Sequence, residues 1–84
     1  MEYKVLIKLF VPEIEQKFDM YIPVNKSVGQ VLTLLNKAVN SESFDVYPQK
    51  ESLRLINRRT SHVYNQTDVI RQTDIKNGTE LIII

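Results

Sequence analysis

Two stretches near the start of the chain alternate between apolar and polar residues, as the strands of a half-buried sheet do. Residues 3–11 alternate over their whole length, and residues 18–22 repeat the pattern. A period of two that is rich in β-branched residues is typical of a strand. The connection over residues 12–15 is short, so we expect the two strands to form an antiparallel hairpin.

An amphipathic helix is predicted over residues 28–39. Ser27 directly precedes it and Gln30 follows three residues later; this spacing is typical of a capping box, in which each side chain binds the other residue's backbone N–H. Leu34 lies off the apolar stripe. The stripe, at steps of three and four residues, consists of Val28, Val31, Leu32, Leu35, Ala38 and Val39.

The second half of the chain is predicted to form three short strands and one helical turn. The strands rest on apolar alternation and cover residues 53–55, 62–64 and 79–84. The helical turn is expected over residues 68–75, with the side chain of Asp68 as its N-cap.

Two further segments complete the pattern. Residues 41–51 are mostly polar, and we expect a loop that one or two apolar side chains attach to the core. Asn77-Gly78 is the clearest turn dipeptide. It precedes the apolar run 81–84, which suits a central strand that is buried on both faces or exposed on one.

The composition excludes several kinds of chemistry. The 84 residues include no cysteine and a single histidine, His62, so disulfides, thiol nucleophiles and multi-histidine metal sites are excluded. Lys and Arg number 11 against 10 Asp and Glu, a balance that gives no general electrostatic case for binding nucleic acid or an anionic membrane. We therefore expect one domain, residues 1–84, that is not an enzyme and holds no cofactor or metal.

No targeting or membrane segment is predicted. Lys4 and Lys8 interrupt the first apolar stretch, which therefore lacks the continuous apolar region of a secretory signal. The run 81–84 is far shorter than the about 20 apolar residues that a membrane helix needs. We expect a cytoplasmic protein without direct membrane insertion.

His62 is the only histidine, and the chain offers it no catalytic partner. Ser61 is adjacent in sequence, but adjacent strand residues point to opposite faces. Arg58 and Arg59 precede His62 in a turn, with Arg54 nearby. They form either a solvated turn or a spot where a partner docks. Since no basic stripe or aromatic platform accompanies them, nucleic-acid binding is not expected.

The order of the predicted elements defines an α+β fold in which one long helix covers one face of one mixed sheet. The first and last strands are the most apolar, so we place them side by side at the centre of the sheet. They are then parallel, and the rest of the chain forms the crossover between them. This is the β-grasp arrangement, with a mixed sheet of about five strands.

The sequence resembles ubiquitin-like domains in its second half. The resemblance rests on residues 53–57, 70–75 and 77–84, and its most specific part is 70–81. The size of the chain and the segment 43–46 are more similar to the small bacterial ubiquitin-like proteins of the YukD/EsaB type. That resemblance implies an accessory or regulatory role in a type VII secretion system of Gram-positive bacteria.

The sequence departs from ubiquitin and from the sulfur carriers of this fold at its end. Those proteins carry two terminal glycines on a flexible tail, whereas this sequence ends at Ile84 and its only glycines are Gly29 and Gly78. Glycine lets such a tail enter a narrow active site because it has no Cβ. We therefore do not expect conjugation or sulfur transfer.

The face of the sheet that points away from the helix is the predicted interaction surface. Alternation places Leu6, Phe10, Ile56, Ile82 and Ile84 on it. A contiguous apolar group on neighbouring strands is unusual for a solvated face, and ubiquitin-like folds use this face for partner recognition. The expected site is Leu6, Ile56, Ile82 and Ile84, with Arg54, Arg58, Arg59 and His62 as its rim.

The occupant of this face is left open. A protein partner, for example a secretion-system component, and a second copy in a homodimer both fit an apolar sheet face. An adaptor of unrelated bacterial or phage function is the alternative role. A sulfur carrier or modifier and a small nucleic-acid binder are the less favoured ones.

Overall fold

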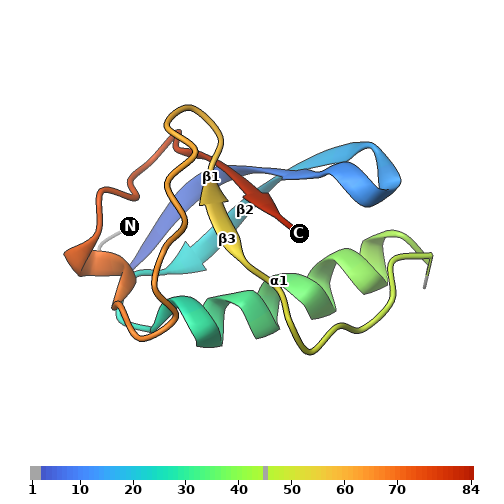
Figure 1. Ribbon diagram of the computed structural model, residues 1–84, viewed down its shortest axis with the longest axis horizontal. Coiled ribbons are helices and arrows are strands. Elements are labelled where there is room, and N and C mark those ends of the chain that lie inside the picture. The colour runs from blue at the N-terminus through green and yellow to red at the C-terminus, as the bar shows by residue number, and fades with distance from the viewer. Residues whose placement is uncertain (1–2, 45) are drawn as a thin grey trace.

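The computed structural model describes residues 3–44 and 46–84 and shows one sheet with a helix lying across one of its faces (Figure 1). The sheet has four strands in the order β2-β1-β4-β3. The prediction of a β-grasp fold is confirmed, with four strands in place of about five. In chain order the elements are β1 (Lys4–Val11), the 3-10 turn η1 (Pro12–Ile14), β2 (Gln16–Pro23), α1 (Val28–Glu42), β3 (Leu55–Asn57), the 3-10 turn η2 (Ile70–Gln72) and β4 (Glu80–Ile83).

The predicted hairpin and the predicted central pair of strands are both confirmed. β1 and β2 pair antiparallel over all eight residues of each strand. β4 lies beside β1 in parallel, with Lys8 opposite Glu80, and pairs antiparallel with β3 on its other side. Because β1 and β4 each have a neighbour on both sides, they form the centre of the sheet.

A tight turn fixes β4 to β1 directly before β4 begins. The N–H of Leu6 donates to Asn77 Oδ1 at 2.7 Å, and the N–H of Gly78 donates to the carbonyl of Leu6 at 2.8 Å. The φ of Gly78 is 87°, a left-handed conformation that glycine adopts without steric cost. The expected Asn77-Gly78 turn therefore also sets the parallel register.

The helix α1 begins with the predicted capping box. Ser27 Oγ accepts from the N–H of Gln30 at 3.2 Å, and Gln30 Oε1 accepts from the N–H of Ser27 at 3.0 Å. The helix ends at Glu42 rather than at residue 39. The predicted stripe packs on the sheet, and its buried members are Val28, Val31, Leu32, Leu35 and Val39.

The loop after α1 is held to the helix by two asparagine side chains. Asn36 is buried; its Nδ2 donates to the carbonyl of Pro48, and its Oδ1 accepts from the N–H of Lys50. Asn40 Nδ2 donates to the carbonyl of Tyr47, whose ring lies in the core. One apolar side chain therefore attaches this loop to the core, within the expected one or two. Asp45, part of the segment 43–46, lies outside the described residues, as do residues 1–2.

The expected strand over residues 62–64 is wrong. This segment makes one isolated bridge, between Val63 and Ile56 of β3, and no ladder. The chain turns immediately afterwards, where the N–H of Asp68 donates to the carbonyl of Asn65. The turn follows too closely for a second bridge to form.

The expected role of Asp68 as an N-cap is also wrong. The helical turn η2 has Val69 as its N-cap, and no side chain caps it. Asp68 instead contributes its backbone carbonyl, which accepts from the N–H of Val28 at 2.8 Å. The segment before η2 is thus tied to the start of α1 through its backbone.

Candidate protein-interaction face

Neighbouring strands bring four apolar side chains into one line across the outer face of the sheet, which is the face away from α1. Cross-strand pairing puts Phe10 of β1 beside Ile82 of β4, and Ile82 beside Ile56 of β3. Val63 extends the line through its bridge to Ile56. We call Phe10, Ile82, Ile56 and Val63 the apolar row. The first three are half-buried and Val63 is 47% exposed.

Ile84 lies beside the apolar row, because it follows Ile82 by two residues and so points to the same face. It is 46% exposed. Its backbone exchanges hydrogen bonds with Arg54, at 2.9 and 3.3 Å. The structure therefore brings together Ile56, Ile82 and Ile84 of the predicted site, with Arg54 next to them.

Leu6 lies elsewhere on the same face. Its cross-strand neighbour is Tyr21 on β2, and the pair Lys8–Glu80 separates it from the level of Ile82. The β1 residue next to Ile82 is Phe10, which the expected site did not include. Alternation identified Phe10 as outward-facing, but choosing between the two required the register of β1 against β4.

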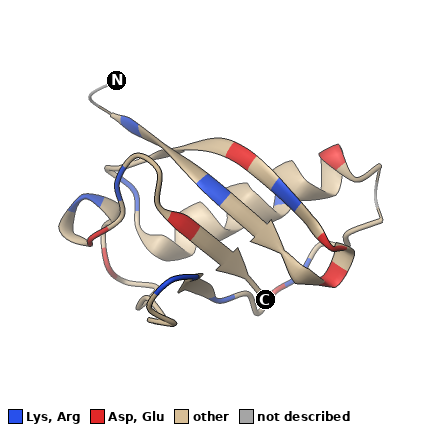
Figure 2. Ribbon diagram, turned by 90° about the horizontal axis from the view of Figure 1, so that it is seen from above, with Lys and Arg blue, Asp and Glu red and all other residues tan. Residues whose placement is uncertain are grey.

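A charged line runs alongside the apolar row, and its signs alternate (Figure 2). Pairing places Asp19 of β2 opposite Lys8 of β1, and Lys8 opposite Glu80 of β4. Arg58 follows β3 and completes the line with an ion pair to Glu80 at 3.6 Å. The guanidinium of Arg58 also lies 3.9 Å from the ring centre of Phe10, a cation–π contact that covers part of the apolar row.

The turn over residues 57–62 carries the other rim residues, Arg59 and His62. Asn57, which is buried, accepts from the N–H groups of Arg59 and Thr60 at 2.9 and 3.1 Å. Its Nδ2 donates to the hydroxyl of Tyr64 at 3.1 Å. His62 is exposed and packs edge-on against the ring of Tyr64. The turn is thereby held in one conformation beside the apolar row.

Tyr64 connects this turn to the segment before β4. Its hydroxyl donates to Asp74 Oδ1 at 2.6 Å. Burial, followed by the hydrogen bond to Asp74, raises the pKa of Tyr64 to about 12. The hydroxyl is therefore a neutral donor at physiological pH, with the role of holding the rim in place.

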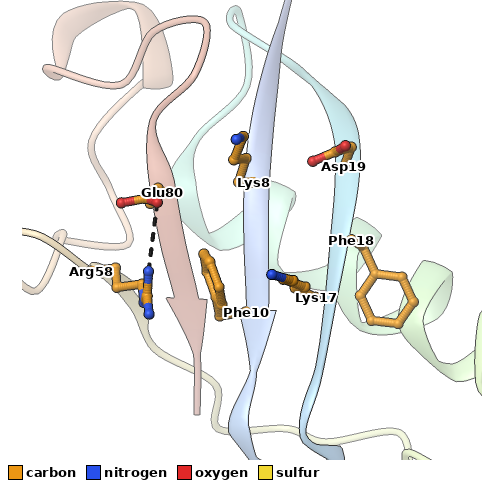
Figure 3. A pocket seen from close by; sticks show the side chains of 7 residues that line it. All are labelled: Lys8, Phe10, Lys17, Phe18, Asp19, Arg58 and Glu80. Atoms are coloured by element: carbon orange, nitrogen blue, oxygen red, sulfur yellow. Dashed lines mark ion pairs between the residues drawn. The ribbon is translucent and has the colours of Figure 1, made fainter.

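A hollow of about 490 Å³ opens over β1 and β2, beside the apolar row. Phe10 lies in its wall between Arg58 on one side and Lys17 on the other (Figure 3). A second, more apolar hollow of about 280 Å³ is lined by Phe10, Ile82 and the hairpin end around Pro12. Apolar surface with a cationic border can bind a protein side chain, and nothing in this geometry assembles a nucleophile with a base.

Within residues 3–44 and 46–84, no group of three or more His, Asp or Glu residues is placed to hold a metal ion. Over the same part of the chain, no helix has both the length and the apolar character needed to cross a bilayer.

The fold is the β-grasp fold of ubiquitin-like domains, with one helix across a mixed sheet of order β2-β1-β4-β3. Comparison of the sequence with models of protein families and with curated proteins finds no match. Solved structures do match in fold. One is a chain of the MycP5-free ESX-5 inner membrane complex, with a TM-score of 0.80 and 18% identity over 98% of this chain and 21% of that one.

Two ubiquitin-like structures of similar size match as well. Caldiarchaeum subterraneum ubiquitin has a TM-score of 0.64 and 14% identity, over 95% of this chain and 90% of that one. A ubiquitin-like domain of an Arabidopsis thaliana protein has a TM-score of 0.63 and 12% identity, over 98% and 77%. The chain spans about a fifth of the length of the ESX-5 chain. At these identities the likeness establishes the fold.

Proposed function

We propose that this protein is a non-enzymatic interaction module whose outer sheet face binds a protein partner. The observation that carries the proposal is the line of apolar side chains across four neighbouring segments, Phe10 to Ile82 to Ile56 and Val63, on the face that α1 leaves uncovered. Burying apolar surface supplies about 25 cal/mol per Å² before association costs are subtracted. Arg54 and Arg58 border the row and can pair with carboxylates of a partner.

The partner that we propose is a component of a type VII secretion system, which this protein would serve as a cytoplasmic accessory or regulatory factor. Two observations support this choice: the resemblance of the sequence to the YukD/EsaB type, and the similarity in fold to a chain of the ESX-5 inner membrane complex.

Site-specific photocrosslinking in the bacterium that makes the protein tests this proposal. Benzoylphenylalanine is placed at position 84 on the outer face or, as the matched control, at position 34 on α1. The native residues at the two positions are 46% and 48% exposed. We expect position 84 to crosslink to a component of the secretion membrane complex, and position 34 not to do so.

Each other outcome of the crosslinking experiment has a definite meaning. Crosslinking of position 84 to a second copy would favour a homodimer through this face, and crosslinking to an unrelated protein would favour an adaptor of different function. Equal, nonspecific labelling from positions 84 and 34 would contradict the proposed binding face.

A further inference from the structure

The two edges of the sheet differ in how their backbone groups are used. β3 forms one edge, which the segment 62–64 covers. The N–H of Asn57 donates to the carbonyl of His62 at 2.8 Å, and the N–H of Tyr64 donates to β3 at 3.0 Å. β2 forms the other edge over eight residues. It pairs with β1 on one side only, so its other side is the long open edge of the sheet.

The pairing of β2 with β1 shows which backbone groups face this open edge. In an antiparallel ladder, hydrogen-bonded pairs of residues alternate with pairs that are not hydrogen-bonded. The N–H of Val24 donates to the carbonyl of Tyr3, so every second residue before Val24 also bonds to β1. The backbone groups of Lys17, Asp19 and Tyr21 therefore point away from the sheet. They are available to a further strand.

The side chains at this edge carry opposite charges two residues apart. Lys17 and Asp19 are both exposed and lie on the outer face, where Asp19 is opposite Lys8 of β1. Asp19 is the last member of the line of alternating charges described above, so a cation beyond the edge would continue that line. The ammonium of Lys17 leans toward Phe10 in the single chain (Figure 3), and the flexible lysine stem allows it to turn to the edge.

We propose that two copies of this chain form a dimer in which their β2 strands pair antiparallel, with the two-fold axis at Phe18. Lys17 of each copy then lies opposite Asp19 of the other, so both pairs on the outer face have opposite charges. The backbone groups of the same two residues face outward, so each pair also exchanges backbone hydrogen bonds. The two four-stranded sheets become one continuous sheet.

Other positions of the axis fit this edge less well. An axis at either charged residue places two like charges directly opposite each other, which is unfavourable. An axis at Met20 leaves Lys17 opposite Pro23, which has no N–H to donate. An axis at Gln16 places β2 against the turn η1 of the other copy. The axis at Phe18 alone combines opposite charges with outward-facing backbone groups.

Phe18 supplies an apolar contact at the axis. It is half-buried on the helix side of β2, where it packs against the core together with Met20. Its ring lies on the side of β2 away from β1 (Figure 3). Across the axis it meets Phe18 of the other copy in a pair that is not hydrogen-bonded, the closer kind. Aromatic pairs in this position stabilise a sheet.

The dimer goes beyond the proposed function, because it concerns self-association through β2 rather than a partner on the β3–β4 side of the outer face. Residues opposite each other across paired strands point to the same face, so the two helices share one face and the two apolar rows the other. A partner with two binding sites would then be bound more tightly by the dimer than by one copy.

The size of the contact sets its strength. One pair of strand edges buries less than the about 1,200–2,000 Å² of a stable interface, so the dimer forms only at high protein concentration. Added salt weakens it, because the charges that select the pairing lie at the surface and are screened.

Sedimentation equilibrium of the purified chain, from micromolar to millimolar concentration, measures the association. We expect the wild type to form dimers and nothing larger, because pairing of β2 with β2 uses up the open edge of both copies. Lys17→Glu and Asp19→Lys should each weaken the dimer roughly tenfold, since either change makes both pairs across the axis like-charged. Lys76→Glu, at an exposed position before β4, is the control and should leave the dimer unchanged.

Restoring the opposite charges provides the decisive measurement. The chain that carries both Lys17→Glu and Asp19→Lys has the net charge of the wild type and should dimerise like it. An equimolar mixture of the two single variants should form dimers that contain one copy of each. Circular dichroism checks that each variant is folded.

Amide hydrogen exchange locates the contact on the chain. At millimolar concentration the N–H groups of Lys17 and Asp19 should exchange more slowly than at micromolar concentration, because they become hydrogen-bonded across the axis. Exchange of these two groups that does not depend on concentration, in a chain that forms dimers, would place the contact on another surface and overturn the inference.

Two further results would also overturn it: a wild type that stays monomeric at millimolar concentration, and a doubly changed chain that associates as weakly as the single variants. Neither result bears on crosslinking from position 84 to a secretion component, which depends on a different protein and a different part of the sheet.

Discussion

The two faces of the central strands are built from similar residues and end in different environments. On the face toward α1, Ile7, Leu9, Leu81 and Ile83 are at most 1% exposed. On the other face, Phe10 and Ile82 are half-buried and Ile84 is 46% exposed. Side chains of β1 and β4 alternate between the two faces, and both sets of positions contain apolar residues. The difference is that a helix covers one of them, whereas long charged side chains such as Arg58 cover part of the other.

This difference separates stability from binding. Residues beneath α1 are closely packed, so a substitution there should lower the free energy of unfolding. Residues on the outer face have fewer neighbours, so a substitution there should change the affinity for a partner more than the free energy of unfolding.

Leu35→Ala should remove a major part of the stability. Leu35 is 2% exposed between α1 and the sheet, and truncating a buried leucine costs about 2–5 kcal/mol. The measurement is chemical unfolding monitored by circular dichroism. Leu34→Ala, at the exposed neighbouring position, is the control and should change the free energy of unfolding by less than about 0.5 kcal/mol. Equal effects at both positions would show that the helix is rotated from the orientation described.

Tyr64→Phe should destabilise the rim at the edge of the outer face. The change leaves Asn57 Nδ2 without its acceptor and Asp74 without its donor, which costs about 1–3 kcal/mol. The pKa of Tyr64 is raised from 10 to about 12, so the folded state holds the phenol proton more tightly than the unfolded state. This contribution is fully present below pH 10 and is lost as the pH rises through 12.

Unfolding of both proteins across that pH range checks the prediction for Tyr64. The difference in stability between the wild type and Tyr64→Phe should be constant below pH 10 and should decrease above it. A difference that stays constant to pH 12 would contradict the raised pKa of Tyr64, which burial and then the hydrogen bond to Asp74 cause.

Ser27→Ala should have a smaller effect, because it removes one cap and no packing. Loss of an N-cap hydroxyl costs about 1 kcal/mol, and Ser27→Gly costs less. Thermal unfolding of the two variants measures the difference. If both variants have the melting temperature of the wild type, the hydrogen bond from Gln30 N–H to Ser27 Oγ contributes nothing to the stability of the helix.

Local features of the fold could be predicted from the sequence because short-range rules decide them. The hairpin follows from period-two alternation and a short connection, and the start of α1 follows from Ser27 and Gln30. The apolar stripe does not predict the last turn of α1, because residues 40–42 are polar and do not extend the stripe. They remain helical, and Asn40 makes its side-chain bond to Tyr47 from there.

Alternation within a strand predicts which side chains of the candidate site share a face, whereas the register between strands decides which of them are neighbours. Ile56 and Ile82 follow from alternation within β3 and β4, and Ile84 follows from the same alternation directly after β4. The side chains of Leu6 and Phe10 point to the same face of β1, so alternation cannot choose between them. The register of β1 against β4, which the Asn77-Gly78 turn fixes through Leu6, shows that Phe10 lies next to Ile82. Asn57 and Tyr64 hold the rim through side-chain hydrogen bonds, and the spacing of apolar and polar residues along the chain does not indicate such bonds.

The central claim is that the outer face binds a partner and contributes little to folding, and Ile56→Glu tests it most directly. The change is made in the chain that carries benzoylphenylalanine at position 84, with Leu34→Glu as the control for an added charge. We expect unfolding free energy within about 1 kcal/mol of the parent. Crosslinking should be lost, because an unpaired charge buried in the contact costs several kcal/mol. A folded Ile56→Glu variant that crosslinks like its parent, or a variant that unfolds, would contradict the claim.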